Sequence, residues 1–255
     1  MSATLLGAQH LRIEVPGRVL VDGLEVSVQP GEFLALLGGN GAGKSLLLRT
    51  LAGLRQPAGG QVTLAEQRID QMSRRDIARR LGFLPQDPEG VPQGTVHESL
   101  LLGRFAHLGF WEASTSADEE RVTRALIQVG LAGFGGRELS SLSGGEQRRV
   151  AIARLLVQEP SVYLLDEPTN HLDPAQQIGV LQGMRALTRA GAAVIVSLHE
   201  PNLALRFADR VGLMAGAGEV ELLDVSALET AHLGRLYGLG YAETRIGAQR
   251  FMTPG

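Results

Sequence analysis

A glycine-rich peptide between an apolar run and a segment of helical spacing constrains the fold of this chain more than any other feature. Residues 32–37 form a compact apolar run, which predicts a buried strand. After the peptide, leucines recur at the spacing of one helix face, at Leu47, Leu48, Leu51 and Leu54. The peptide itself fits the pattern G-x-x-x-x-G-K-[ST] and reads Gly38-Gly39-Asn40-Gly41-Ala42-Gly43-Lys44-Ser45. A strand, a tight loop and a helix in this order predict an α/β core.

The same peptide has the chemistry of a phosphate-binding loop. Small residues let backbone N–H groups surround phosphate oxygens at the positive end of the following helix. Lys44 would reach the β- and γ-phosphates, and the hydroxyl of Ser45 would contact Mg²⁺. Lys44 is the single lysine of a chain with 23 arginines, and an accident of composition is a poor explanation for its place. The sequence therefore predicts binding of a nucleoside triphosphate.

Length, charge and composition exclude several classes of protein. The chain has 255 residues, of which 44% are hydrophobic, enough for one large domain or two closely joined lobes. A net charge of −3 argues against a nucleic-acid binder with a basic face. Cysteine is absent, which excludes disulfides and thiolate sites. No signal-peptide pattern is present, and no apolar run approaches the roughly 20 residues of a membrane span. We expect a cytosolic chain that works at a membrane only by docking onto another protein.

The spacing of apolar residues predicts a core interrupted by a helical block. Strands are expected within residues 11–28 and at 62–64, 81–85, 162–165 and 193–198. Between about residues 87 and 157 helical spacing dominates, while 109–118 is expected to be a surface loop. The arginines of residues 74–80 predict the solvated face of a helix. We expect a single domain over 1–255, with a mostly parallel α/β core lobe at about 1–86 and 158–255 and a helical subdomain at about 87–157.

A second motif, Leu142-Ser143-Gly144-Gly145-Glu146-Gln147, combines a helix start with an unusual pair of glycines. Ser143 and Glu146 predict a capping box, which by itself explains a helix start. A cap does not need Gly144 and Gly145, because glycine is a poor helix former. Bare N–H groups at a helix N-terminus, together with the Ser143 hydroxyl, favour contact with a phosphate.

A third motif is the strand 162–165 that ends in Asp166 and Glu167. In an ATPase, Asp166 would hold Mg²⁺, directly or through water, and Glu167 would orient and polarise the attacking water. Two solvated acids after a strand are the alternative for an isolated pair. Beside a phosphate loop at the end of a neighbouring strand, the catalytic interpretation is favoured.

Two further polar residues follow core strands and are expected at the same edge of the sheet. His199 comes directly after the strand 193–198, within reach of a γ-phosphate or of Glu167. Gln86 follows the strand 81–85, within reach of Mg²⁺ or the attacking water. A single histidine or glutamine is weak evidence for a site. The position of each directly after a core strand makes it a candidate.

These segments, in this order, resemble the ATP-binding cassette family of transporter ATPases over essentially the whole chain. The resemblance implies a P-loop NTPase core with a mostly parallel sheet, N-terminal antiparallel β-strands and an inserted α-helical subdomain. It implies an ATP hydrolase that uses ATP and Mg²⁺, with Glu167 and His199 as catalytic residues. It implies Mg²⁺ ligands at Ser45, Gln86 and Asp166, with residues 38–46 and 143–145 on the nucleotide.

The resemblance also implies partners. Two copies pack head to tail, and each ATP lies between residues 38–45 of one copy and Ser143-Gly144-Gly145 of the other, with Asp173 communicating across the interface. The helical block would receive a short helix of a membrane subunit near Gln86. The expected assembly is a homodimer on two transmembrane permease subunits, served indirectly by a substrate-binding protein, without nucleic acid. It lies at the cytoplasmic face of the cell membrane as a peripheral protein.

Three positions depart from the family pattern, and two stretches of sequence indicate a subgroup within the family. Leu46 stands where threonine is usual, Gly39 replaces a frequent proline, and Val15 holds the place of the aromatic that stacks on adenine. Residues 101–109 and 236–238 are similar to importers of iron-siderophores, haem and cobalamin. The alternatives are a cassette for another substrate class, an exporter, a non-transport cassette ATPase, or a module that uses ATP only to hold a dimer together.

Overall fold

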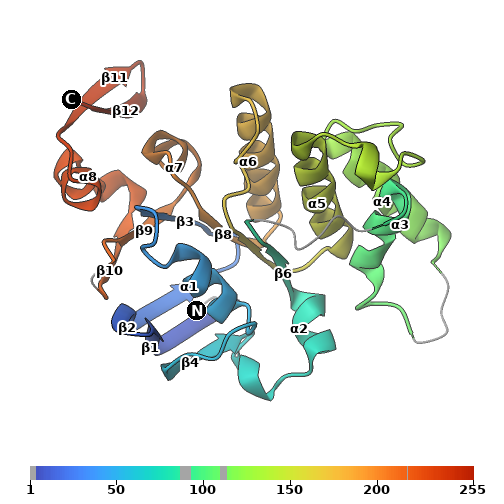
Figure 1. Cartoon of the computed structure of the whole chain (residues 1–255), viewed down its shortest axis with the longest axis horizontal. Coiled ribbons are helices and arrows are strands. Elements are labelled where there is room, and N and C mark those ends of the chain that lie inside the picture. Colours follow the sequence, from blue (N-terminus) through green and yellow to red (C-terminus); the bar gives the residue numbers. More distant parts are fainter. Residues whose placement is uncertain (1–3, 87–92, 110–113, 217) are drawn as a thin grey trace.

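The computed structural model of the chain describes residues 4–86, 93–109, 114–216 and 218–255 (Figure 1). Near the N-terminus, an antiparallel sheet has the strand order β2-β1-β4-β5. Its strands are β1 (Leu6–Val15), β2 (Arg18–Val28), β4 (Gly59–Leu64) and β5 (Gln67–Arg68). The first two strands are longer than the sequence predicted, because β1 and β2 pair over nearly their whole length.

The second sheet forms the centre of the molecule and has the order β10-β9-β3-β8-β7-β6. Its strands are β3 (Phe33–Gly38), β6 (Leu81–Leu84), β7 (Val162–Leu165), β8 (Ala193–Ser197), β9 (Arg210–Met214) and β10 (Val220–Asp224). All neighbours are parallel except β9 and β10. Every residue of β3, β7 and β8 is buried, as expected for parallel strands covered on both faces. The predicted fold class is confirmed.

Helices cover the central sheet and also gather at one end of the molecule. Figure 1 shows α3, α4 and α5 together at that end, and the hairpin of β11 and β12 at the opposite end. The helices are α1 (Lys44–Leu51), α2 (Arg74–Arg80), α3 (Val96–Leu101), α4 (Ser116–Gln128), α5 (Gly144–Gln158), α6 (Pro174–Arg189), α7 (Pro201–Phe207) and α8 (Thr230–Tyr237). Short 3₁₀ turns are η1 (Ile69–Gln71), η2 (Leu102–Arg104), η3 (Leu139–Ser141) and η4 (Val225–Ala227), and the hairpin is β11 (Tyr241–Ile246) with β12 (Gln249–Pro254). Within the described residues, no helix is both long and apolar enough to span a bilayer.

The helical block has a small core of its own. Val96 and Leu100 of α3 pack with Val122 of α4 and Val150 of α5, apart from the two clusters that bury the faces of the central sheet. The predicted limits of the subdomain, about 87–157, stay a prediction because residues 87–92 lie outside the described part.

One expectation about this region was wrong. Residues 109–118 were expected to form a loop, yet α4 already begins at Ser116, where Thr115 and Asp118 make a capping box. Residues 110–113 of that stretch lie outside the described part. The arginines of α2 are exposed, as expected. In addition, Arg75 and Arg79 each donate to the carbonyl of Ala106, at 3.0 and 2.8 Å, so α2 is tied to the turn after η2. A guanidinium on a short helix can satisfy carbonyls that a turn leaves unpaired.

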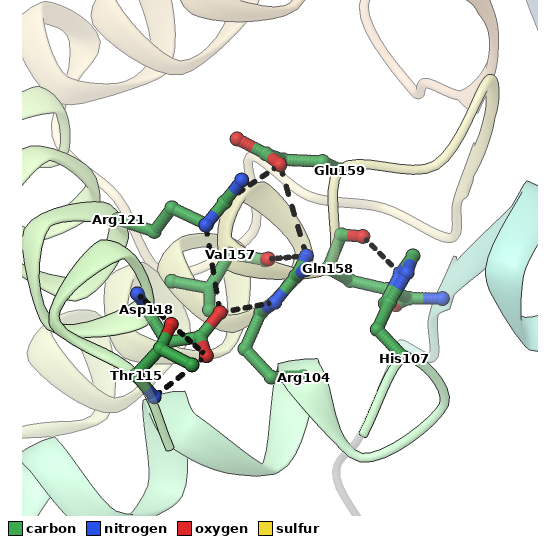
Figure 2. Close-up of polar contacts among 8 residues, drawn as sticks. All are labelled: Arg104, His107, Thr115, Asp118, Arg121, Val157, Gln158 and Glu159. Atoms are coloured by element: carbon green, nitrogen blue, oxygen red, sulfur yellow. Dashed lines mark hydrogen bonds and ion pairs between the residues drawn. The ribbon is translucent and has the colours of Figure 1, made fainter. Parts of the chain in front are cut away.

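A buried ion pair links η2, α4 and the end of α5 (Figure 2). Arg104 is 9% exposed and Asp118 is 3% exposed. Arg104 Nε donates to Asp118 Oδ1 at 2.8 Å, and its Nη1 donates to the carbonyl of Val157 at 3.2 Å. On the outer side, Arg121 bonds Glu159 at 2.8 Å. The network fixes the C-terminal end of α5 and the turn after α3 with respect to each other.

Candidate functional site

The loop between β3 and α1 is shaped by glycines and closed by Lys44. Gly41 and Gly43 have φ angles of 74° and 103°, a region that other residues rarely adopt. A Cβ on Gly38 would lie 2.5 Å from the carbonyl oxygen of Met214, so only glycine fits there. Lys44 is 5% exposed, and its Nζ donates to the carbonyls of Gly38 at 2.7 Å and Gly39 at 3.1 Å. The ammonium therefore lies inside the loop that it completes.

Burial has an electrostatic consequence for this lysine. Desolvation lowers the pKa of Lys44 below its ordinary value, while the nearby carboxylates of Glu167 and Asp166 act in the opposite direction. A bound phosphate group would act in the same direction as these carboxylates and favour the protonated amine.

One cavity of about 340 Å³ brings most of the predicted residues together. Its lining includes Gln86, which follows β6, Glu167, which follows β7, and Leu20 of β2. The remaining lining residues come from the loop and the start of α1, namely Asn40, Gly41, Ala42, Gly43, Lys44, Ser45 and Leu46. Ends of three different elements thus face one space, as the order of strands predicted.

Asp166 is enclosed at the end of β7, with one oxygen left unsatisfied. It is 1% exposed, and its Oδ1 accepts a hydrogen bond from Ser197 Oγ at 2.7 Å. Its Oδ2 has no hydrogen-bond partner among the described residues. A buried carboxylate oxygen without a partner is costly unless a cation or water uses it. This atom therefore fits the role of a Mg²⁺ ligand, directly or through water.

Glu167 occupies a strained backbone position and is held from several sides. Its φ angle of 48° lies in the left-handed region, which costs a non-glycine residue on the order of 1–3 kcal/mol. Its side chain is 7% exposed, and Oε1 lies 2.6 Å from His199 Nε2. Oε2 accepts a hydrogen bond from the amide of Asn170. The predicted contact between His199 and Glu167 is present, and Asn170 adds a second contact.

Ser197 was missed by the sequence analysis although it orients both acids. Its hydroxyl donates to Asp166 and accepts from the backbone N–H of Glu167 at 2.8 Å. The residue is completely buried in β8. The available signal was a single hydroxyl in the otherwise apolar run 193–198, a position where a buried donor needs a partner.

The glycine pair at the start of α5 lies apart from the cavity. Ser143 is the N-cap, and its backbone N–H and hydroxyl both donate to Glu146, so the predicted capping box is present. Ser143 and Gly144 are exposed, and neither they nor Gly145 line the cavity of the phosphate loop. The structure of one chain therefore does not bring together the two segments that were predicted to bind phosphate.

The described residues contain no group of three or more His, Cys, Asp or Glu side chains arranged to hold a metal ion. Mg²⁺ is commonly held by one or two protein oxygens together with substrate phosphates. Ser45, Gln86 and the free oxygen of Asp166 are donors of that kind.

Comparison with known proteins gives a consistent family. The sequence family described as "ABC transporter" matches residues 21–170. Hemin import ATP-binding protein HmuV of Streptomyces coelicolor is 42% identical over 212 residues, which are 82% of this chain and 74% of the relative. Achromobactin transport ATP-binding protein CbrD of Dickeya dadantii is 37% identical over 89% of this chain and 87% of the relative. Phosphonates import ATP-binding protein PhnC of Alcaligenes faecalis is 39% identical over 87% and 83%.

Solved structures agree with the sequence relatives. A chain from an inward-facing metal-chelate type ABC transporter superposes with a TM-score of 0.83 at 27% identity, covering 98% of this chain and 97% of that one. A dimeric ATP-binding cassette in a post-hydrolysis state, bound to ADP and Pi, superposes with a TM-score of 0.76 at 25% identity. The superposition covers 88% of this chain and all of that one.

Proposed function

Because the chain belongs to the ABC transporter family, we propose that it is the ATP-hydrolysing subunit of an importer for a metal chelate. The family predicted from the sequence is thereby confirmed, and ATP binding by this cassette follows from it. The substrate class, the site residues and the assembly are the proposal.

The observation that carries the proposed chemistry is the position of Glu167, which lines the cavity of the phosphate loop and contacts His199. The backbone N–H groups of residues 38–45 and the ammonium of Lys44 hold the β- and γ-phosphates. Glu167 orients and polarises the water that attacks the γ-phosphorus. His199, at 2.6 Å from Glu167, fixes the direction of that carboxylate and can contact the γ-phosphate. A buried acid held by two side chains needs little rearrangement at the moment of reaction.

We propose Ser45, Gln86 and Asp166 as the residues that hold Mg²⁺. A Mg²⁺ ion held there would supply positive charge against the negative charge that develops on the phosphate oxygens. The Ser45 hydroxyl and the Gln86 amide line the cavity, and Asp166 Oδ2 is the buried oxygen without a partner. Leu46, which also lines the cavity, contributes apolar contact in place of a hydroxyl.

A second copy of the chain would complete the site. Ser143, Gly144 and Gly145 lie at the N-terminal end of α5, where N–H groups are free to meet an anion, yet in one chain none of them lines the cavity. A head-to-tail homodimer places this end of α5 on the phosphates held by the partner's loop. A solved relative of this fold is a dimer with bound ADP and Pi, which supports the arrangement.

A groove beside η2 is the proposed docking place for the membrane subunits. It has a volume of about 760 Å³ and is lined by Leu102 and Phe105, both largely exposed, together with Arg74 and Arg75 of α2. Gln86 is not among its lining residues, and docking near Gln86 stays a prediction. In the proposed assembly, the ATPase dimer lies at the cytoplasmic face of the membrane and binds two transmembrane permease subunits, which a substrate-binding protein serves.

The substrate class rests on the relatives and on two stretches of sequence. Relatives named for hemin and achromobactin import are 42% and 37% identical to this chain, and residues 101–109 and 236–238 resemble that group. A phosphonate importer is the second candidate, because a relative of that name is 39% identical.

A gene deletion separates these candidates. Cells that lack the gene should lose energised uptake of one labelled ferric siderophore, haem or corrinoid, and the wild-type gene should restore it while Glu167→Gln should not. Glu200→Gln is the matched control, since Glu200 is exposed and adjacent to His199. Loss of phosphonate uptake with chelate uptake intact would contradict the proposed substrate class.

A further inference from the structure

Arg148 is a buried arginine of α5 whose guanidinium binds the two loops that carry the proposed catalytic residues. Its Nη1 donates to the carbonyls of Pro85 at 2.6 Å and Gln86 at 3.0 Å. Its Nη2 donates to the carbonyls of Asp166 at 2.6 Å and Glu167 at 2.9 Å. One side chain therefore fixes the backbone at the ends of β6 and β7 simultaneously.

The contact with Glu167 bears on the strained part of the site. The N–H of Glu167 is held by Ser197. Its carbonyl accepts from Arg148 at 2.9 Å and, at the longer distance of 3.2 Å, from the backbone N–H of Asn170. A residue with a φ angle of 48° keeps that conformation only where its surroundings fix it. Removing the contact with Ser197 or Arg148 should let the backbone of Glu167 relax and move its carboxylate away from the attacking water.

The place of Arg148 on α5 gives it a second connection. It lies four residues after Gly144, so about 6 Å along the helix from the exposed N-terminal end. In the proposed dimer, that end touches the ATP of one site, while Gln86 and Glu167 of the same chain serve the other site. The helix α5 therefore connects the two ATP sites through one chain, because its N-terminal end touches one ATP and Arg148 binds the two loops that serve the other.

We propose that Arg148 is a positioning residue that couples the two ATP sites of the dimer, by linking the start of α5 to Gln86 and Glu167. The inference rests on the proposed function and deepens it. Occupation of one site by ATP orders the start of α5, and Arg148 transmits this order to the loops that act on the other ATP. Binding of the second ATP is then favoured by the first.

Arg149 supplies a matched control. It is the next residue of α5 and also donates to carbonyls, those of Val129 and Gly130 at 3.3 and 3.5 Å, but these belong to the helical block. The hydrolysis rate should be measured against ATP concentration for wild type, Arg148→Gln, Arg148→Lys and Arg149→Gln, with melting temperatures recorded beside them.

Wild type should show a Hill coefficient clearly above 1, and Arg149→Gln should match it. Arg148→Gln should fall to a Hill coefficient near 1, with kcat reduced about tenfold because the catalytic groups are misplaced. Arg148→Lys, whose ammonium can still bind some of the carbonyls, should recover part of both. It also serves as the test variant if Arg148→Gln does not fold.

The possible failures are separable. A wild-type chain that hydrolyses no ATP would contradict the proposed function itself. If wild type, Arg148→Gln and Arg148→Lys all hydrolyse ATP with the same Hill coefficient above 1, the proposed role of Arg148 is overturned while the proposed function stands. Noncooperative wild type, or equal losses in the Arg148 and Arg149 variants, would also overturn it, since a merely structural role predicts the same loss for both arginines.

Discussion

Glu167 is the residue on which the proposed chemistry depends most, and its neighbours make a conservative test possible. Glu167→Gln keeps the shape of the side chain and the surrounding contacts while it removes the charge that polarises water. Hydrolysis should fall by a factor of about 10² to 10⁴, whereas ATP binding should persist. Size-exclusion chromatography with ATP should then show a stable dimer. Hydrolysis near the wild-type rate would mean that Glu167 is not the catalytic carboxylate.

Lys44 allows a chemical test because the sequence has a single lysine. Burial lowers the pKa of Lys44, so a larger fraction is the reactive free amine at a given pH than for an exposed lysine. Bound phosphates should raise this pKa again and cover the amine. We therefore expect acylation of Lys44 to abolish ATPase activity and MgATP to protect it.

Peptide mass mapping measures this labelling, and the α-amine of Met1 is the internal control. Labelling of Met1 should not change with nucleotide. Equal labelling of Lys44 with and without MgATP, together with retained activity, would show that the loop does not hold phosphate.

Most residues around the cavity could be predicted because their motifs are local, but their supports could not. The predicted residues directly follow strands of the central sheet, so strand order suffices to place them at one edge of that sheet. They are Gly38 to Ser45, Asp166, Glu167 and His199. Ser197 and Arg148 contact them only through the tertiary fold. The sequence analysis assigned no role to Arg148, although it lies in phase with the buried Ile152 and Leu155 of α5.

At the scale of elements, the Arg104–Asp118 pair is expected to hold the helical block together (Figure 2). Arg104→Met leaves the buried carboxylate of Asp118 without its closest cation, and breaking such a pair costs roughly 3–5 kcal/mol. Chemical denaturation should show a loss of this size. Arg121→Met, which removes a more exposed partner, should cost about 1 kcal/mol or less. Equal losses for both variants would contradict the importance of the inner pair.

The Arg104–Asp118 pair also makes the free energy of unfolding depend on pH. Hydrogen bonds from Thr115 and Arg104 lower the pKa of Asp118 below its ordinary value of 3.8. A carboxylate whose pKa is lower in the folded state stabilises the fold above the unfolded pKa, and this stabilisation is lost as the pH falls toward the folded value. The difference in stability between wild type and Arg104→Met should therefore be full at pH 7 and shrink below about pH 4. A difference that stays constant down to pH 3 would exclude this origin.

Helices and strands with a strong local sequence pattern were predicted well. Those whose limits depend on contacts with distant parts of the chain were not. The strand at 162–165 was predicted with the limits that β7 has, because an apolar run ends there in two acids. The start of α4 was placed too late, since its cap residues were read as a polar loop. The strand predicted at 62–64 begins earlier, at Gly59 of β4, because only pairing with β1 makes this glycine-containing segment a strand.

At the scale of the whole molecule, the phosphate loop and the start of α5 belong to one chain and yet do not meet in it. Each has the chemistry of a phosphate site, and each is incomplete alone. The family to which the chain belongs includes a cassette seen as a dimer with bound ADP and Pi. The central claim is therefore that ATP is hydrolysed between two copies, at sites built from both.

Mixing two inactive variants tests this claim most directly. Lys44→Ala removes the loop's charge, and Ser143→Arg blocks the start of α5. Either variant alone should be inactive, but a mixed dimer has one intact site, made from the loop of the Ser143→Arg chain and the α5 end of the Lys44→Ala chain. Since half the dimers are mixed and each has one of two sites intact, an equal mixture should recover up to roughly a quarter of the wild-type rate. A mixture no more active than the separate variants would contradict the shared site.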